Sequence, residues 1–310
     1  MKNSRFYRIA KKFAPYLGLL LLILVSIALG GSTFLAAKNL RNIMIQSSML
    51  MVISVGTAFV MAHGDMDFAN GGIMGLTMVI AIVFFRDLPT WAFLVVCLLI
   101  GFAMGALVGV LVTKLRVVAF IVGMCIMRLC SAILSTITQS QTWSASPALS
   151  GLNTPSFYLI TCVIVVPLGF VAFEYTKVGQ YNKAIGVNRA AAKLSGIPVD
   201  RYLIFSFAAS GLCAGVVAFM TSVRTGGLSN STGSYEVNAL IGLTIGGMPL
   251  TGGSKAYIRS AVIGALSLTI LNNILVLCGV NADFVNVIKG AVFLLLVLIS
   301  YRKRADSVTA

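Results

Sequence analysis

The chain has 310 residues, of which 58% are hydrophobic and only 10% are charged, and its net charge is +15. Soluble domains carry about 25% charged residues, so this composition excludes a soluble globular protein and requires an apolar solvent. The Lys and Arg residues lie in short segments between apolar runs, and no compact basic domain is present to bind nucleic acid. We expect these residues to contact the anionic surface of a lipid bilayer instead.

Ten apolar segments are candidates to cross a membrane, because a spanning helix needs about 20 apolar residues. The sequence therefore predicts an all-α, polytopic membrane protein with about ten transmembrane helices, some of them short or interrupted, in a single domain over residues 1–310. The shortest candidate is 237–250. The predicted spans are residues 15–35, 42–62, 68–85, 90–112, 117–137, 157–174, 202–222, 237–250, 257–278 and 284–301.

The distribution of basic residues predicts the orientation, because Lys and Arg concentrate in short cytoplasmic loops. We place the N-terminus inside and let each span cross once. Both termini are then cytoplasmic, with tails over 1–14 and 302–310, and residues 174–201 form the longest cytoplasmic loop. Only four basic residues then fall in outside loops: Lys38, Arg41, Arg86 and Arg224.

A polar break, "HGDMDFANGG" (63–72), separates the second and third spans and leaves no room for a real loop. Asp65 and Asp67 therefore lie at or just within the inner membrane boundary. Asp67 directly precedes an apolar run, where a carboxylate can cap the free N–H groups of a helix. The alternative is that Asp67 holds an interrupted helix pair at the inner end of a solute pathway, with Asp65 facing water or solute.

Polar residues inside other spans are further candidates. Arg128 lies near mid-membrane, where such a residue usually faces protein or water. A cavity or interface role and a bond to backbone carbonyls both remain open for it. Asn272 and Asn273 are predicted to bond between helices, with contact to a polar solute as the alternative. Lys289 lies near the outer end of the last span and is expected to extend outward.

The segment "GVNRAAAKLSGIP" (186–198) predicts a helix of about two turns in the long cytoplasmic loop. Asn188 is suited to cap its start, and Gly196 suits the left-handed position after its end, with Pro198 as a stop. Ala190, Ala191 and Leu194 share one side, where small residues allow close approach of a partner protein. The alternative is a helix resting on lipid headgroups through its basic side.

The chemistry of an enzyme is missing. The nearest approach to a phosphate loop, "GMPLTGGSK" (247–255), has Gly253 where the motif requires Lys. His63 is the only histidine, which excludes a multi-His metal site, and the spans contain few acids for an ion relay. We therefore expect a chain that is not an enzyme and binds no metal or cofactor itself.

The 186–197 segment resembles the coupling loop of the ribose-type permeases of bacterial ATP-binding-cassette importers, whose pattern is G-x-N-x-x-A-A-x-x-S-G-I. "AFIVGMCIMR" (119–128) and "IGGMPLTGG" (245–253) are similar to family segments in the same order. The 63–72 break resembles the family's G-G-I-D-L-S-V-G at Gly64, Asp67 and Gly71, and departs from it at Asp65, Ala69 and Asn70. The resemblance covers about residues 40–301. The coupling-loop matches are Gly186, Asn188, Ala191, Ala192, Ser195, Gly196 and Ile197.

The resemblance implies a permease subunit in the bacterial cytoplasmic membrane that forms the pathway for a small polar solute, in the first place a sugar. ATP would bind to a separate ATPase subunit docked on the loop, and an extracytoplasmic solute-binding protein would deliver the solute. A second copy, or a homologous permease, would complete the pathway. The alternatives are an ion-coupled secondary carrier and a non-transport assembly or receptor subunit. The coupling residues would be Gly186, Asn188, Ala190, Ala191, Leu194, Ser195 and Gly196.

Overall fold

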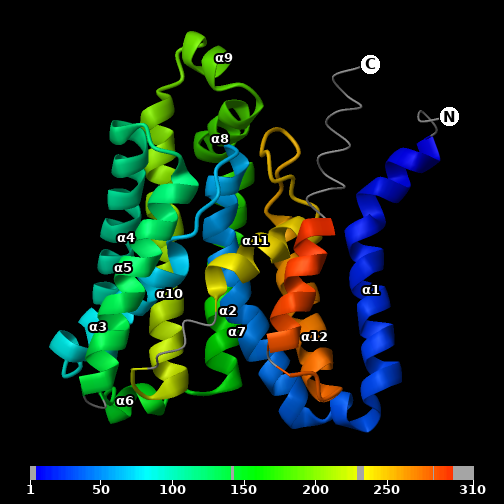
Figure 1. Ribbon diagram of the computed structural model, residues 1–310, viewed down its shortest axis with the longest axis vertical. Helices are drawn as coiled ribbons and strands as arrows, with labels where there is room; N and C mark the ends of the chain where they lie inside the picture. The colour runs from blue at the N-terminus through cyan, green and yellow to red at the C-terminus, as the bar shows by residue number, and fades with distance from the viewer. Residues whose placement is uncertain (1–4, 141–142, 229–233, 282, 296–310) are drawn as a thin grey trace.

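The computed structural model describes residues 5–140, 143–228, 234–281 and 283–295 (Figure 1). These ranges are mostly helical and contain no β-strand, so the all-α prediction is confirmed. Seven helices of the described part are long and apolar enough to cross a membrane. They are α1 (Arg5–Leu35), α2 (Ala37–Ala62), α4 (Thr90–Leu115), α5 (Ala119–Ser140), α7 (Pro155–Glu174), α10 (Val199–Thr225) and α12 (Arg259–Leu277).

Two predicted spans are shorter helices. α3 (Asn70–Phe85) has 16 residues and α11 (Tyr235–Ile245) has 11. At 1.5 Å per residue they measure about 24 and 16 Å, less than the roughly 30 Å hydrocarbon layer. Figure 1 shows why α3 is short: the chain leaves the end of α2 as an extended segment and begins α3 only partway down the bundle. Its backbone thus starts a helix inside the protein.

The ends of the chain are described in part. α1 begins at Arg5, so residues 5–14 of the predicted tail are helical. The predicted last span, 284–301, is helical as far as residue 295. Its remaining residues and the predicted 302–310 tail lie outside the described residues.

α2 and α10 form the centre of the bundle. Every residue of α2 from Ser47 to Ala62 is buried. α10 packs closely on α4 through glycines, since a Cβ at Gly101 would overlap the backbone oxygen of Gly211. Such close approach of backbones is a common way for membrane helices to associate, because lipid offers no hydrophobic drive between them. This rigid pair supports the polar residues described below.

Three further helices are short: α6 (Pro147–Ser150), α8 (Lys177–Val187) and α9 (Arg189–Leu194). α8 and α9 lie at one end of the bundle, and α9 extends beyond the other helices (Figure 1). The Asn188 side chain accepts hydrogen bonds from the backbone N–H groups of Ala190 and Ala191, at 3.0 and 3.1 Å. Gly196 has a φ of +81°. The predicted helix is therefore present with its predicted cap and stop, whereas α8, capped by Thr176, was not predicted.

Candidate functional site

The outer side of α9 is exposed and apolar. Leu194 is 90% exposed, Ala190 and Ala191 are also exposed, and Val187 at the end of α8 is 66% exposed. Ala192 points the other way and is buried in a small cluster with Ile185 and Leu203. α9 is thus anchored to the bundle by one alanine while it presents the opposite side to its surroundings. Ser195 and Gly196, which end the helix, are exposed as well.

Behind this helix, four glycines bring three segments together. We call Gly64, Gly186, Gly252 and Gly253 the glycine junction. The N–H of Gly253 donates to the carbonyl of Ala62, the last residue of α2, at 2.8 Å. A Cβ at Gly186 would overlap both that carbonyl oxygen and the Gly253 nitrogen. Gly186 therefore serves as an inner contact of the loop, and it ties α8 to the end of α2.

An ion pair joins α9 to the break after α2. Arg189 Nη2 lies 2.6 Å from Asp65 Oδ2, and His63 Nδ1 lies 3.2 Å from the same oxygen. The Asp65 side chain is only 15% exposed. The structure thus places Asp65 against Arg189, where the sequence suggested that it faces water or solute. Sequence reasoning missed this pair because 124 residues separate its members.

These contacts bear on the charges of the two acid–base groups at the end of α2. Burial lowers the pKa of His63 below its ordinary value of 6.5, although the neighbouring Asp65 opposes this shift. Burial alone would raise the pKa of Asp65. The contact with His63 and the charge of Arg189 outweigh burial, so that the pKa of Asp65 falls below its ordinary 3.8. Asp65 is therefore ionised and His63 neutral at pH 7.

Further along the break, polar side chains are buried and paired. Asp67 is 1% exposed, and its Oδ1 accepts a hydrogen bond from the Ala69 N–H at 2.9 Å. The Asn70 amide donates to Thr57 of α2 at 2.9 Å and to Ser210 of α10 at 3.0 Å. Asp67 thus stabilises the turn just before α3. It accepts the N–H of Ala69, which precedes the helix, whereas the sequence suggested that it caps N–H groups of the helix itself. The start of α3 is fixed to the two central helices.

The first turns of the two short helices meet. Gly71 lies in the first turn of α3, and a Cβ there would overlap Oε2 of Glu236, which is buried in the first turn of α11. Both carboxylates, Asp67 and Glu236, are thus placed near helix N-termini, which favour negative charge. Sequence reasoning missed Glu236. An acid just before a short apolar run was the available signal.

The remaining predicted residues separate into different environments. Arg128 lies on α5 with an exposed side chain and makes no ion pair with the residues that the structure describes. Asn273 exchanges two hydrogen bonds with Asn39 of α2, at 2.7 and 3.0 Å. Asn272 instead lines a cavity together with Lys289. Of the two neighbouring asparagines, one joins helices and the other lines a cavity.

Comparison with known proteins decides the family. Residues 39–297 match the family described as "Branched-chain amino acid transport system / permease component". The chain belongs to this family. It is accordingly a multi-pass protein of the bacterial cytoplasmic membrane, in agreement with its seven long apolar helices.

Individual relatives are sugar import permeases. The chain is 30% identical to the ribose import permease of Haemophilus influenzae over 296 residues, which is 90% of each chain. It is 30% identical to that of Escherichia coli over 300 residues, or 92% of each chain. The fructose import permease of Bifidobacterium longum is 24% identical over 314 residues, covering 94% of this chain and 92% of that one. No solved structure matches the chain.

Proposed function

We propose that this chain forms the membrane pathway of a sugar importer whose ATP-binding subunit is a separate protein. The observation that carries this proposal is the exposed helix α9, which is anchored by Ala192 and joined through Arg189 to the break before α3. The import permeases for ribose and fructose that the chain resembles support a sugar as the solute. No ATP or metal site in this chain is part of the proposal.

The topology that we propose has ten crossings and cytoplasmic termini. The extended residues 66–69 and the short helix α3 together make one crossing, with residues 63–65 at its cytoplasmic end, and α11 with the segment that follows it to residue 250 makes another. This assignment places α8 and α9 in the cytoplasm, where the basic residues of the 174–201 loop favour them. It also places the far end of α10, with Arg224, at the outer face.

In this orientation, α9 docks on the ATPase subunit. The exposed Ala190, Ala191 and Leu194 are small or apolar and offer a surface that a protein groove can bury. Movement of α9 reaches the break through the Arg189–Asp65 pair and the glycine junction. The alternative is that α9 only rests on lipid headgroups, in which case a bulky or charged residue on this side has no effect on ATP hydrolysis.

The pathway itself is proposed to involve the interrupted helices. Half-helices that start inside the membrane often form solute sites, because irregular backbone is tolerated there only when it is buried or lines a cavity. A second permease copy, or a homologous one, and an extracytoplasmic solute-binding protein complete the assembly. The exposed Arg128 lies on a helix face that such a copy can cover.

Reconstitution tests the proposal. The permease, its ATPase and its binding protein are placed in liposomes, and uptake of labelled pentoses, hexoses and their acid derivatives is measured. We expect uptake only with all three components and ATP. A permease that accumulates solute alone under a proton or sodium gradient would instead be a secondary carrier, which would contradict the proposal.

A further inference from the structure

A cavity of about 590 Å³ lies beside the central helix α2, away from α8 and α9. Arg224 and Thr225 of its wall lie in the last turn of α10, the helix that begins next to α9. Other walls come from α2, α11, α12 and the helical residues 283–295. Small-molecule sites usually measure about 300–1,000 Å³, so this cavity is large enough for a monosaccharide.

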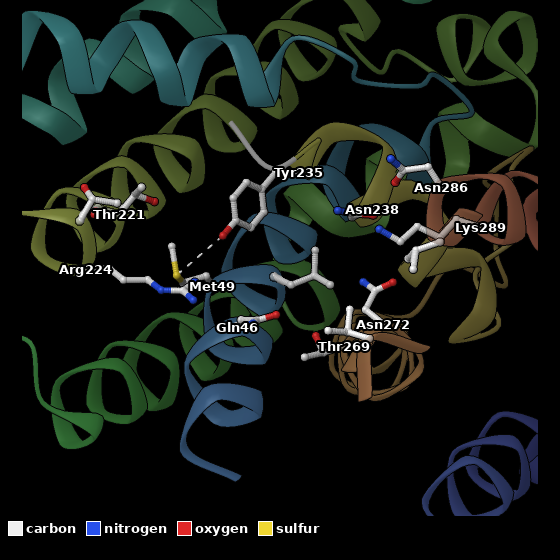
Figure 2. Close-up of a pocket in the computed structure, with 14 residues that line it drawn as sticks. Gln46, Met49, Thr221, Arg224, Tyr235, Asn238, Thr269, Asn272, Asn286 and Lys289 are labelled. Atoms are coloured by element: carbon white, nitrogen blue, oxygen red, sulfur yellow. Dashed lines mark hydrogen bonds between the residues drawn. The ribbon is translucent and has the colours of Figure 1, made fainter. Parts of the chain in front are cut away.

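The lining is rich in groups that bind hydroxyls. Four amides contribute to it, and an amide both donates and accepts hydrogen bonds, as a sugar hydroxyl does. The Oδ1 atom of Asn272 is buried and has no hydrogen-bond partner in the described part of the chain. Among the described residues, the Tyr235 hydroxyl donates to the sulfur of Met49 at 3.8 Å, and this sulfur is a weak acceptor (Figure 2). The four amides are Gln46, Asn238, Asn272 and Asn286.

The charged side chains that line the cavity are all positive. Figure 2 shows Arg224 and Lys289 approaching from opposite sides with their charged ends directed inward. None of the lining residues is an acid. Among the described residues, neither cation has a carboxylate within 4.0 Å. Glu236, although next to Tyr235, is buried against Gly71 and is not part of the lining.

Arg224 is exposed and Lys289 is half-buried where they line the cavity. Two cations that line one cavity without a counter-charge favour an anion there. We infer that this cavity is a binding site for a sugar derivative that carries a carboxylate or a phosphate. The amides bind its hydroxyls, and Arg224 and Lys289 bind its anion from two sides. The inference rests on the proposed importer function. In the proposed topology the cavity lies toward the outer face, and the solute binds there before it crosses the membrane. It narrows the solute class from sugars in general to acidic sugar derivatives.

Protection of a cavity cysteine tests the site without ATP, ATPase or binding protein. The reporter Thr225→Cys is introduced into purified permease in lipid nanodiscs, with the exposed Cys125 and Cys278 replaced by Ser. Labelling by neutral iodoacetamide is followed in D-ribose, D-ribonate or D-ribose 5-phosphate at matched ionic strength. Gln46→Cys provides a second reporter should Thr225→Cys fold poorly. The two anions distinguish a carboxylate ligand from a phosphate ligand.

We expect at least one anion to halve the labelling rate at a concentration about tenfold below that of D-ribose, which corresponds to about 1.4 kcal/mol. Lys289→Gln should remove this preference. Lys38→Gln, an equal change of charge at an exposed residue outside the cavity, should keep it. Equal protection by D-ribose, or no protection by any of the three solutes, would overturn the inference. ATP-driven uptake of a neutral sugar in the full complex would leave the importer function intact in either case.

Discussion

Arg189 and Asp65 join the exposed helix α9 to the helix break after α2, with the guanidinium Nη2 2.6 Å from the carboxylate Oδ2. The Asp65 side chain is only 15% exposed, but the Arg189 side chain is 49% exposed, and ion pairs that water screens contribute only about 0–1 kcal/mol to stability. The pair therefore contributes little to the fold as such. Its position between the proposed docking helix and the start of α3 indicates a role in transmitting movement.

This relationship predicts a separation of stability from coupling. Arg189→Gln or Asp65→Asn should lower solute-stimulated ATP hydrolysis of the complex several-fold while the thermal unfolding temperature of the permease changes little. The exchanged pair Arg189→Asp with Asp65→Arg should recover part of the stimulation, because the attraction is restored. Measurements are made on the reconstituted complex at equal permease abundance. Full stimulation in both single variants would exclude the pair from coupling.

A second prediction concerns pH and the end of α2. The pKa of His63 lies below 6.5 in the folded chain because the ring is buried. As pH falls through 6.5, the unfolded chain takes up the proton first, so stability is lost as the medium becomes acidic. Asp65, whose pKa also lies below its ordinary value of 3.8, loses its contribution only at a much lower pH.

The variant His63→Gln isolates this effect, since the chain has no other histidine. Unfolding temperatures of the wild type and the variant are compared from pH 8 to pH 5 in one detergent. We expect the wild type to lose more stability than the variant below about pH 6.5. Parallel curves for the two proteins would show that His63 is not a buried neutral group.

The glycine junction gives a third prediction. A methyl group at Gly186 would overlap backbone atoms of Ala62 and Gly253, which cannot turn aside as a side chain can. Overpacking of this kind costs about 1–3 kcal/mol, so Gly186→Ala should lower the unfolding temperature and weaken coupling. Gly18→Ala is the matched control, because nothing lies within 4 Å of a Cβ there. Equal effects of the two substitutions would show that the junction is loosely packed.

The sequence was most informative where structure is local. The helix over residues 189–194, its Asn188 cap and the left-handed Gly196 follow from residues within a few positions of one another, and all are present. The apolar pattern likewise identified the seven long helices, because lipid requires about 20 apolar residues for each.

Relations between distant segments could not be read in this way. α11 ends at Ile245, but the predicted apolar run continues to residue 250, and hydrophobicity alone does not mark where a helix stops. Gly247, with a φ of +93°, was the local signal for the end of the helix. The Arg189–Asp65 pair and the contact of Gly71 with Glu236 depend on how three or more helices pack together. Asn272 and Asn273 are neighbours in sequence, yet only the packing of α12 against α2 decides which one lines the cavity.

A fourth prediction concerns Asp67. Its carboxylate accepts the Ala69 N–H in a fully buried place, and an unpaired buried donor costs about 1–3 kcal/mol. Asp67→Ala should therefore lower both stability and transport strongly. Asp67→Asn keeps an oxygen acceptor and should retain the fold. If Asp67→Asn also transports normally, the hydrogen bond is what matters. If its fold is retained but transport is lost, the charge is required as well.

The last prediction tests docking by α9 itself. Leu194 is 90% exposed, so Leu194→Asp should leave the permease folded. It should nevertheless weaken ATPase binding about tenfold or more if the leucine is buried on docking, because a buried carboxylate without a partner is costly.

Ala191→Trp on the same side should keep normal membrane abundance and abolish solute-stimulated ATP hydrolysis. Ala192→Trp is the contrasting variant: it enters the buried contact with Ile185 and Leu203 and should reduce abundance instead. Co-purification of the ATPase with each variant, at equal permease abundance where that is reached, separates the outcomes. Normal ATPase retention and stimulation with both Leu194→Asp and Ala191→Trp would mean that α9 rests on the lipid surface and that the ATPase binds elsewhere.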